Sequence, residues 1–256
     1  MAKPRQTAEA ERASRERAQQ LLDAEERTER RIAAAFALLV LLASRLPGGR
    51  RFVARYEASM RAELSAALSE GRDGGRAAAL RAWELDAEVL RRELPAEVAP
   101  GPTVASTVDD AAETARIAAA VAAVVARWRG RFGERVAEGL PERKAARAAT
   151  REEATRSTTI LAATETAEAF SGELVAQRAE VVAAVEEHGR AGATLALVPF
   201  DVWDAVLDRR TCRACEELDG DVRPSAIGFD EPPPLHPHCR CTLGLLLLEA
   251  GFAWED

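Results

Sequence analysis

Apolar and polar residues follow a helical spacing through most of the chain, and the first segment is the most polar. Residues 5–31 consist mainly of Ala, Glu, Arg and Gln, which favour a helix but offer little apolar surface to bury. A solvated helix is therefore predicted there. It should continue into the apolar run 32–43 and end near Pro47, because Pro and Gly terminate helices.

The run 32–43 is apolar on all sides of a helix. It is shorter than the roughly 18 to 20 residues that span a bilayer, so we expect a helix buried on most of its surface and no membrane segment. A contact between subunits would also account for such a helix, which makes self-association a candidate interaction.

Two further helices are predicted before the first proline-rich linker. One covers 52–68 and should break at the glycine-rich segment 71–75, and the next covers 76–94. In the latter, apolar residues recur every three or four positions and form one stripe, so Trp83 is expected to be a core residue. The stripe consists of Leu80, Trp83, Ala87, Leu90 and Leu94.

A linker and two more helices are expected next. Residues 95–102 contain three prolines and a glycine, which preclude regular structure. Segment 106–109 resembles a capping box with Asp in place of Glu or Gln, so a helix should follow to about residue 129. Pro141 suits the first turn of the last helix, which continues to about residue 187. Glycines should break up the chain between these helices: Gly130, Gly133 and Gly139.

After Gly192 the pattern changes to short apolar segments bounded by turn residues. Segments 194–200 and 202–208 are predicted strands, and 242–248 is a third. The fold class predicted is therefore mainly α with a small C-terminal α+β region.

Three consecutive regions follow from this pattern. Residues 1–99 form a helical N-terminal region, 100–140 a linker and helix, and 141–256 a C-terminal domain that contains the short strands and every cysteine.

Composition narrows the class of protein. Apolar residues make up 47% of the chain but aromatic residues only 5%, which favours helices packed on small side chains. A net charge of −7 gives no support for nucleic-acid binding, which needs clustered positive charge. A long charged stretch precedes the first apolar run and does not resemble a secretory signal, so the cytoplasm, where thiols stay reduced, is the expected compartment.

The candidate chemistry lies in one C-terminal segment. All four cysteines and two of the three histidines fall between Cys212 and Cys241. In a reducing compartment such a cluster is typical of a metal site, and Zn²⁺ prefers four N/S ligands in a tetrahedron. The segment is therefore predicted to be stapled by a structural zinc, with ligands drawn from Cys212, Cys215, His236, Cys239 and Cys241.

The ligand set stays open at this point. His236 and Cys239 repeat the two-residue spacer of Cys212 and Cys215, which ranks them first. Cys241 would share a face with Cys239 in an extended chain, so four thiolates are an alternative. His238 is ranked last, and disulfides among the four cysteines are the remaining explanation.

A catalytic zinc is disfavoured by the order of the motif. Zinc deaminases combine a His-x-Glu or Cys-x-Glu element with a later Pro-Cys-x-x-Cys, whereas here Cys-x-x-Cys comes first and no His-x-Glu occurs. There are enough soft ligands to close the shell, so we expect no enzyme activity.

The cysteine segment resembles the phage head-morphogenesis domain, the Mu F-like family of minor head proteins. The resemblance rests on Trp203, on Asp-x-Arg-Thr-Cys-x-x-Cys at 208–215, on a Leu-x-Gly turn at 218–220 and on Pro-x-His-Pro-x-Cys-Arg-Cys at 234–241. It implies a structural minor capsid protein of a tailed phage or prophage-derived particle, acting in head assembly or genome delivery. The implied partners are the portal and other head proteins, and the implied location is the virion, or the host cytoplasm during assembly.

The resemblance covers roughly 141–248 and includes one upstream element. Thr164-Glu165 is similar to a Thr-Glu element on a helix of the same family. His238 replaces a common Asn, which argues against His238 as a required ligand.

Two other functions are alternatives to a structural head protein. A zinc-supported nuclease or toxin-like enzyme carried in the particle would need a general base near the metal, and a free-standing cytoplasmic adaptor would have no link to phage. The nearby acids are Glu216, Glu217, Asp219 and Asp221.

Overall fold

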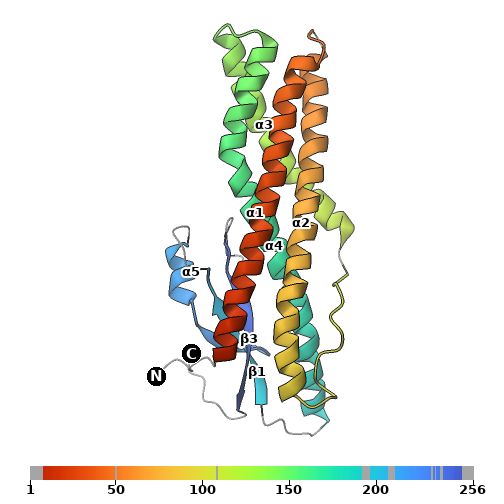
Figure 1. Cartoon of the computed structure of the whole chain (residues 1–256), viewed down its shortest axis with the longest axis vertical. Helices are drawn as coiled ribbons and strands as arrows, with labels where there is room; N and C mark the ends of the chain where they lie inside the picture. Colours follow the sequence, from red (N-terminus) through yellow and green to blue (C-terminus); the bar gives the residue numbers. More distant parts are fainter. Residues whose placement is uncertain are drawn as a thin grey trace. The chain divides into compact units, whose positions relative to one another are not determined.

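The structure is a computed structural model. It describes residues 8–49, 51–107, 109–191, 197–206, 211–231, 233, 235, 236 and 239–249. Long helices come first and a small antiparallel sheet follows near the C-terminus (Figure 1), which confirms the predicted fold class. The elements are α1 (Ala8–Arg45), α2 (Phe52–Glu93), α3 (Asp110–Ala137), α4 (Glu142–Arg190), β1 (Leu197–Asp204), α5 (Arg213–Leu218), β2 (Val222–Pro224) and β3 (Thr242–Glu249).

The chain divides into two compact units, each made of segments that are distant in sequence. The first, here called the sheet unit, comprises 1–24, 75–106 and 166–256, and the second, the helix unit, comprises 25–74 and 107–165. This division follows spatial contacts, so the boundaries predicted at residues 99 and 140 stay predictions.

An aromatic cluster forms the centre of the helix unit. The Tyr56 ring lies 5.0 Å from that of Trp128, and both side chains are fully buried. Thr150 Oγ1 accepts a hydrogen bond from Trp128 Nε1 at 3.1 Å and lies 2.7 Å from the Tyr56 hydroxyl. The polar atoms of both rings are thereby satisfied inside an apolar core.

The apolar run of α1 is buried on one face only. Ile32, Phe36 and Leu39 lie in the core of the helix unit, whereas Leu38 and Leu41 are 40% and 55% exposed. The expectation of burial on most of the helix surface was therefore too strong. No helix among the described residues is long and apolar enough to cross a membrane.

The polar start of α1 is more buried than predicted. Leu21, Ala24 and Arg17 are each at most 3% exposed. The prediction of a solvated helix was wrong on this face, because Leu21 and Ala24 fill the core of the sheet unit and the Arg17 charge is paired.

Helix α2 runs without a break through the glycines at 71–75. The predicted break was wrong because two of these glycines allow close helix packing. A Cβ on Gly71 would lie 2.4 Å from Thr28 Cγ2, and one on Gly75 would lie 2.7 Å from the Thr166 carbonyl oxygen. Trp83, farther along the same helix, is 1% exposed, which confirms it as a core residue.

Gly75→Ala is predicted to destabilise the protein, whereas Gly74→Ala is not. The new methyl group at 75 meets backbone atoms of α4 that cannot move alone, which typically costs about 1–3 kcal/mol. A methyl group at 74 meets nothing within 4 Å and should add about 0.5–1 kcal/mol through helix propensity. Thermal unfolding of both variants measures the difference, and equal melting temperatures would contradict the packing role of Gly75.

Helix α3 begins and ends differently from the prediction. Asp109 is itself the N-cap and accepts from the N–H groups of Ala111 and Ala112, each at 3.0 Å, so the capping box was wrong. Ser106 instead donates through its N–H and its hydroxyl to Glu173, at 3.0 and 2.7 Å. The helix continues past the glycines at 130 and 133 and ends at Ala137, before Gly139 with its φ of 90°. Helix α4 follows directly after Pro141.

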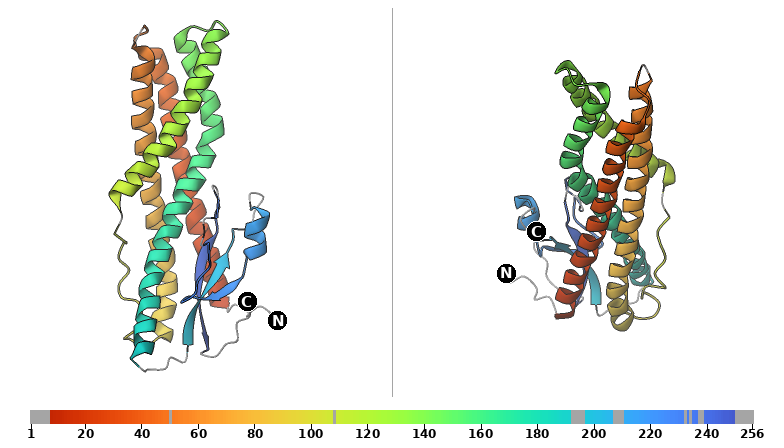
Figure 2. Two further views of the ribbon diagram at one scale, coloured as in Figure 1. Left: turned by 180° about the vertical axis from the view of Figure 1, so that it is seen from behind. Right: turned by 45° about the horizontal axis from the view of Figure 1, so that its top comes forward.

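The sheet has the order β2-β1-β3 with both pairings antiparallel (Figure 2). Val202 lies opposite Val222 on one side and Gly244 on the other. The strand predicted at 242–248 is confirmed as β3. The two strands predicted at 194–200 and 202–208 are one strand, β1, because Asp201 between them is a buried strand residue. Residues 194–196, 207 and 208 lie outside the described part of the chain.

Candidate metal centre

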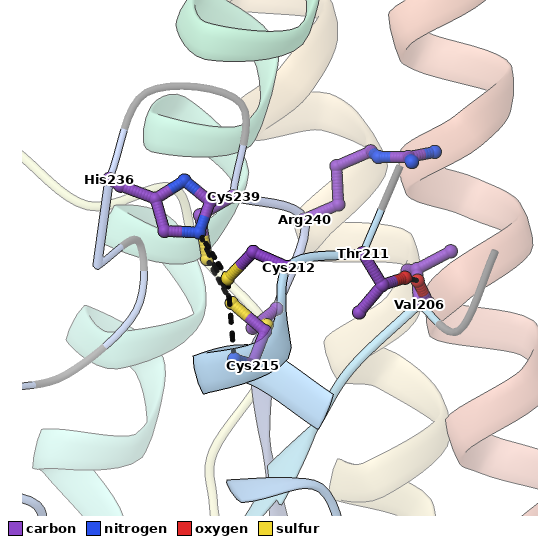
Figure 3. A pocket seen from close by; sticks show the side chains of 8 residues that line it. Val206, Thr211, Cys212, Cys215, His236, Cys239 and Arg240 are labelled. Atoms are coloured by element: carbon purple, nitrogen blue, oxygen red, sulfur yellow. Dashed lines mark hydrogen bonds between the residues drawn. The ribbon is translucent and has the colours of Figure 1, made fainter. Parts of the chain in front are cut away.

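Two segments of the sheet unit bring the cysteines together. Cys212 caps helix α5 and Cys215 lies in its first turn, while Cys239 and Cys241 directly precede β3. Figure 3 shows the side chains of Cys212, Cys215 and Cys239 converging with the ring of His236. The short helix was not predicted, since six residues are too few to show a helical period.

The donor atoms lie at distances typical of ligands around one ion. His236 Nε2 is 2.9 Å from Cys212 Sγ and 3.4 Å from Cys215 Sγ, and Cys215 Sγ is 3.6 Å from Cys239 Sγ. Bonds of about 2.3 Å to sulfur and 2.0–2.1 Å to nitrogen in a tetrahedron place ligand atoms about 3.6–3.8 Å apart. The two distances from Cys215 fit this geometry, and the contact between Cys212 and His236 would have to lengthen by about 0.7 Å.

Cys215 is the common member of two groups of three donors. One group contains Cys212, Cys215 and His236, and the other contains Cys215, Cys239 and Cys241, with the donor atoms of each group within 4.8 Å of one another. This cluster can hold a metal ion. None of the four cysteines forms a disulfide in the structure.

The space between the donors is small. The cavity has a volume of about 10 Å³, close to the minimum that one water molecule needs. This volume is enough for a single ion between the described donors. Its lining consists of Val206, Thr211, Cys212, Cys215, His236, Cys239, Arg240 and Cys241.

Apolar side chains pack around the buried side of the cysteine cluster. Cys215, Cys239 and Cys241 are each at most 2% exposed and pack in one cluster with Trp203 and Leu243. The Trp203 ring meets the ring of Phe229 edge-on at 5.3 Å. Only Cys212 and His236 are half-buried, so solvent reaches the site from their side.

Proton affinity differs sharply among the four thiols. A hydrogen bond with the Cys241 thiol lowers the pKa of Cys239 to about 5, and the same bond, together with burial, raises the pKa of Cys241. Burial raises the pKa of Cys215 to about 12, whereas the N–H of Cys215, 3.4 Å from Cys212 Sγ, lowers the pKa of Cys212. Because Zn²⁺ binds thiolates, metal binding is expected to release the proton of Cys215, whose pKa is raised.

The structure brings together all five predicted ligand residues, but not the nearby acids. No carboxylate is among the described residues that line the cavity. Glu216 and Glu217 are exposed. Asp219 Oδ1 accepts from the Ala205 N–H at 2.9 Å, and the Asp221 carbonyl oxygen accepts from the Trp203 N–H at 2.7 Å.

Of the residues that flank the proposed ligands in the motif, some are described by the structure and others are not. Arg240 is 6% exposed, and its guanidinium points away from the sulfur atoms in Figure 3. Arg210, Asp208 and His238 lie outside the described residues.

Sequence reasoning missed the residues that support the ligand loops. Thr211 Oγ1 donates to the Val206 carbonyl oxygen at 2.6 Å, which closes the loop before Cys212. Ser171 of α4 donates to the Cys241 carbonyl oxygen at 3.3 Å. Thr211 could have been suspected from its position next to Cys212, but nothing in the sequence singles out Ser171.

The Thr164-Glu165 element lies on α4 in the helix unit and is not part of the metal centre. Glu165 Oε2 accepts from Arg72 Nη1 at 2.8 Å, and both side chains are 5% exposed. This element therefore has a packing role in the helix unit.

Comparisons with known proteins found no relative. No family model matches the chain, and neither a curated protein nor a solved structure is significantly similar to it.

Proposed function

We propose that this chain is a structural minor head protein of a tailed phage or prophage-derived particle, and that it contacts the portal. The observation that carries the proposal is that the residues of the Mu F-like resemblance come together in space. Trp203, Cys215, Cys239 and Cys241 belong to one buried cluster, although 38 residues separate the first from the last in sequence. The packing of these motif residues in one cluster supports a structural role for the motif.

The metal proposed for this cluster is zinc. Thiolate and imidazole ligands select soft or borderline ions, and a closed tetrahedral set of them is typical of structural Zn²⁺. The separations from Cys215 support Cys212, Cys215, His236 and Cys239 as the four ligands. Cys241 would then donate a hydrogen bond to the Cys239 sulfur and would not bind the metal itself.

A zinc ion at this point would fix two loops that have little core of their own. It would link α5 to the segment that precedes β3, over a region with few regular elements. Small loop-rich regions commonly need such a cross-link, since their apolar core alone does not offset the conformational entropy lost on folding.

The lining of the cavity gives the enzyme alternative no support. Among the described residues around the cavity there is no carboxylate to act as a general base, and the cysteines and His236 are the proposed ligands. A cavity of about 10 Å³ also leaves no room for a nucleotide or peptide beside the ion.

Metal analysis should find one zinc per chain in protein purified under reducing conditions. The reason is that the described donors converge on a single small cavity. Elemental analysis of the full chain measures the ratio, and fully folded protein without any metal would refute the zinc proposal.

The head-protein proposal is tested by locating the chain in particles. The full chain is co-expressed with the portal and head proteins of a tailed phage, and portal rings and assembled particles are isolated. We expect the chain to co-purify with the rings and to lie at the portal vertex by immunogold labelling. Absence from particles, or metal-dependent DNA cleavage that is lost on replacing Glu216 and Asp219 by Ala, would overturn the structural role.

A further inference from the structure

We infer that metal binding controls whether the start of α1, residues 12–24, stays docked on the sheet. This inference rests on the metal centre of the proposed function. Figures 1 and 2 show the first turns of α1 beside β1 and β3. Two of the contacts that hold this segment end on Asp204, a strand residue that pairs with Thr242 next to Cys241.

Arg17 is the main contact of the segment. Its Nη1 donates to Asp86 of α2 at 2.8 and 3.0 Å, and its Nη2 donates to Asp204 at the end of β1 at 3.2 Å. Ser14, one turn earlier, donates to the other oxygen of Asp204 at 2.8 Å. Asp204 therefore holds α1 at two points.

The path of Arg17 crosses β3 at a glycine. A Cβ on Gly244 would lie 2.4 Å from Arg17 Nη2 and 2.7 Å from Val202 Cγ1. Arg17 thus reaches Asp204 past a position of β3 that has no side chain, and in the register of the sheet this Gly244 lies opposite Val202.

That register is set next to the metal centre. Asp204 pairs with Thr242, which directly follows Cys241. The residue after Asp204 is also tied to the ligand loop, since the Ala205 N–H donates to Asp219 just beyond α5. A metal that joins Cys215 to Cys239 therefore fixes both strand ends that position the Asp204 carboxylate.

Apart from these contacts, the segment is held by a hydrogen bond from Arg81 Nε to Gln20 Oε1 at 3.1 Å and by few apolar side chains. Of the described side chains from 12 to 24, only Leu21 and Ala24 are buried apolar ones. The charges around Arg17 are buried with imperfect pairing, because the Nε atoms of Arg17 and Arg178 have no hydrogen-bond partner among the described residues. A partly satisfied buried network gives weak net stabilisation and depends steeply on its geometry.

Two states follow from these contacts. With metal, Asp204 is fixed and α1 is docked from residue 12 onward. Without metal, the strand ends loosen, Arg17 loses one of its two carboxylates, and residues 12–24 separate from the sheet. Residues 25–45 of α1 belong to the helix unit.

Hydrogen–deuterium exchange on the full chain, with and without a zinc chelator, tests this coupling. Chelation should speed exchange of amides 14–24 by about tenfold or more and leave amides 26–45 unchanged. Arg17→Met should show fast exchange at 14–24 while zinc is still bound, and chelation should add nothing further. Arg15→Met, an exposed position on the same helix, serves as the control and should behave like the unaltered chain.

Each outcome separates the coupling from the metal proposal. If chelation removes zinc and loosens only 211–241, the coupling is wrong and the metal centre stands. If elemental analysis of the same sample finds no metal before chelation, the metal proposal fails and the coupling fails with it. If Arg17→Met unfolds the whole chain, Asp204→Asn provides the second variant, and the chelation result on the unaltered chain remains decisive.

Discussion

Cys215→Ser is expected to lower zinc affinity by at least about 100-fold, more than changes to outer-shell residues usually do. Cys215 is the one residue that belongs to both groups of donors, so its loss leaves neither group with three donors. The loops that carry the ligands should also become less stable when the metal is lost, because the free energy of zinc binding at a structural site contributes to folding. Elemental analysis and competition with a chromogenic chelator measure the loss of affinity, and exchange protection of 205–249 measures the unfolding.

Two controls sharpen this result. Cys241→Ser should keep one zinc per chain, because its thiol lies outside the proposed ligand set and hydrogen-bonds to Cys239. Glu216→Ala changes an exposed side chain next to Cys215 and should alter neither metal content nor protection. If Cys215→Ser bound zinc as tightly as the unaltered chain, the cluster would not be the metal site.

The helices could be predicted because their signal is local. Strong helix formers and three- to four-residue spacing located all four long helices. The glycines of α2 misled the prediction, since glycine both ends helices and permits close approach of a second helix. Only the position of Thr166 beside Gly75 distinguishes the two roles, and that contact spans 91 residues of sequence.

The candidate site was predictable for a related reason. Two Cys-containing motifs whose spacing suits a metal carry their chemistry in the sequence itself. Its support was not predictable. Ser171 on α4 and the pairing of Asp204 with Thr242 depend on how distant segments meet, and neither leaves a mark on the local pattern.

The buried ion pairs are another feature that could not be predicted from the sequence. A chain with 30% charged residues contains many Arg and Glu residues, and nothing local tells an exposed one from a buried one. Arg72 and Arg31 lie on helices with similar composition, yet Arg72 is 5% exposed and Arg31 is 54% exposed.

Arg72→Met is therefore expected to cost about 3–5 kcal/mol of the free energy of unfolding. Arg72 of α2 donates to Glu113 of α3 at 2.7 Å and to Glu165 of α4 at 2.8 Å. Methionine fills a similar volume but leaves Glu165 as a buried carboxylate without this partner. The cost arises because the Glu165 carboxylate stays buried after it loses this ion pair, and urea denaturation of the full chain measures it.

Arg31→Met is the matched control for this prediction, because Arg31 pairs with Glu70 at the surface of the same unit. The side chains of Arg31 and Glu70 are both more than half exposed, so Arg31→Met should lower the free energy of unfolding by less than about 1 kcal/mol. The double variant Arg72→Met/Glu165→Leu should recover much of the stability lost in Arg72→Met, since apolar replacements of a whole buried pair are often neutral. Equal losses in Arg72→Met and Arg31→Met would mean that the buried pair is not what joins α2 to α4, and that the apolar core of the helix unit accounts for their packing alone.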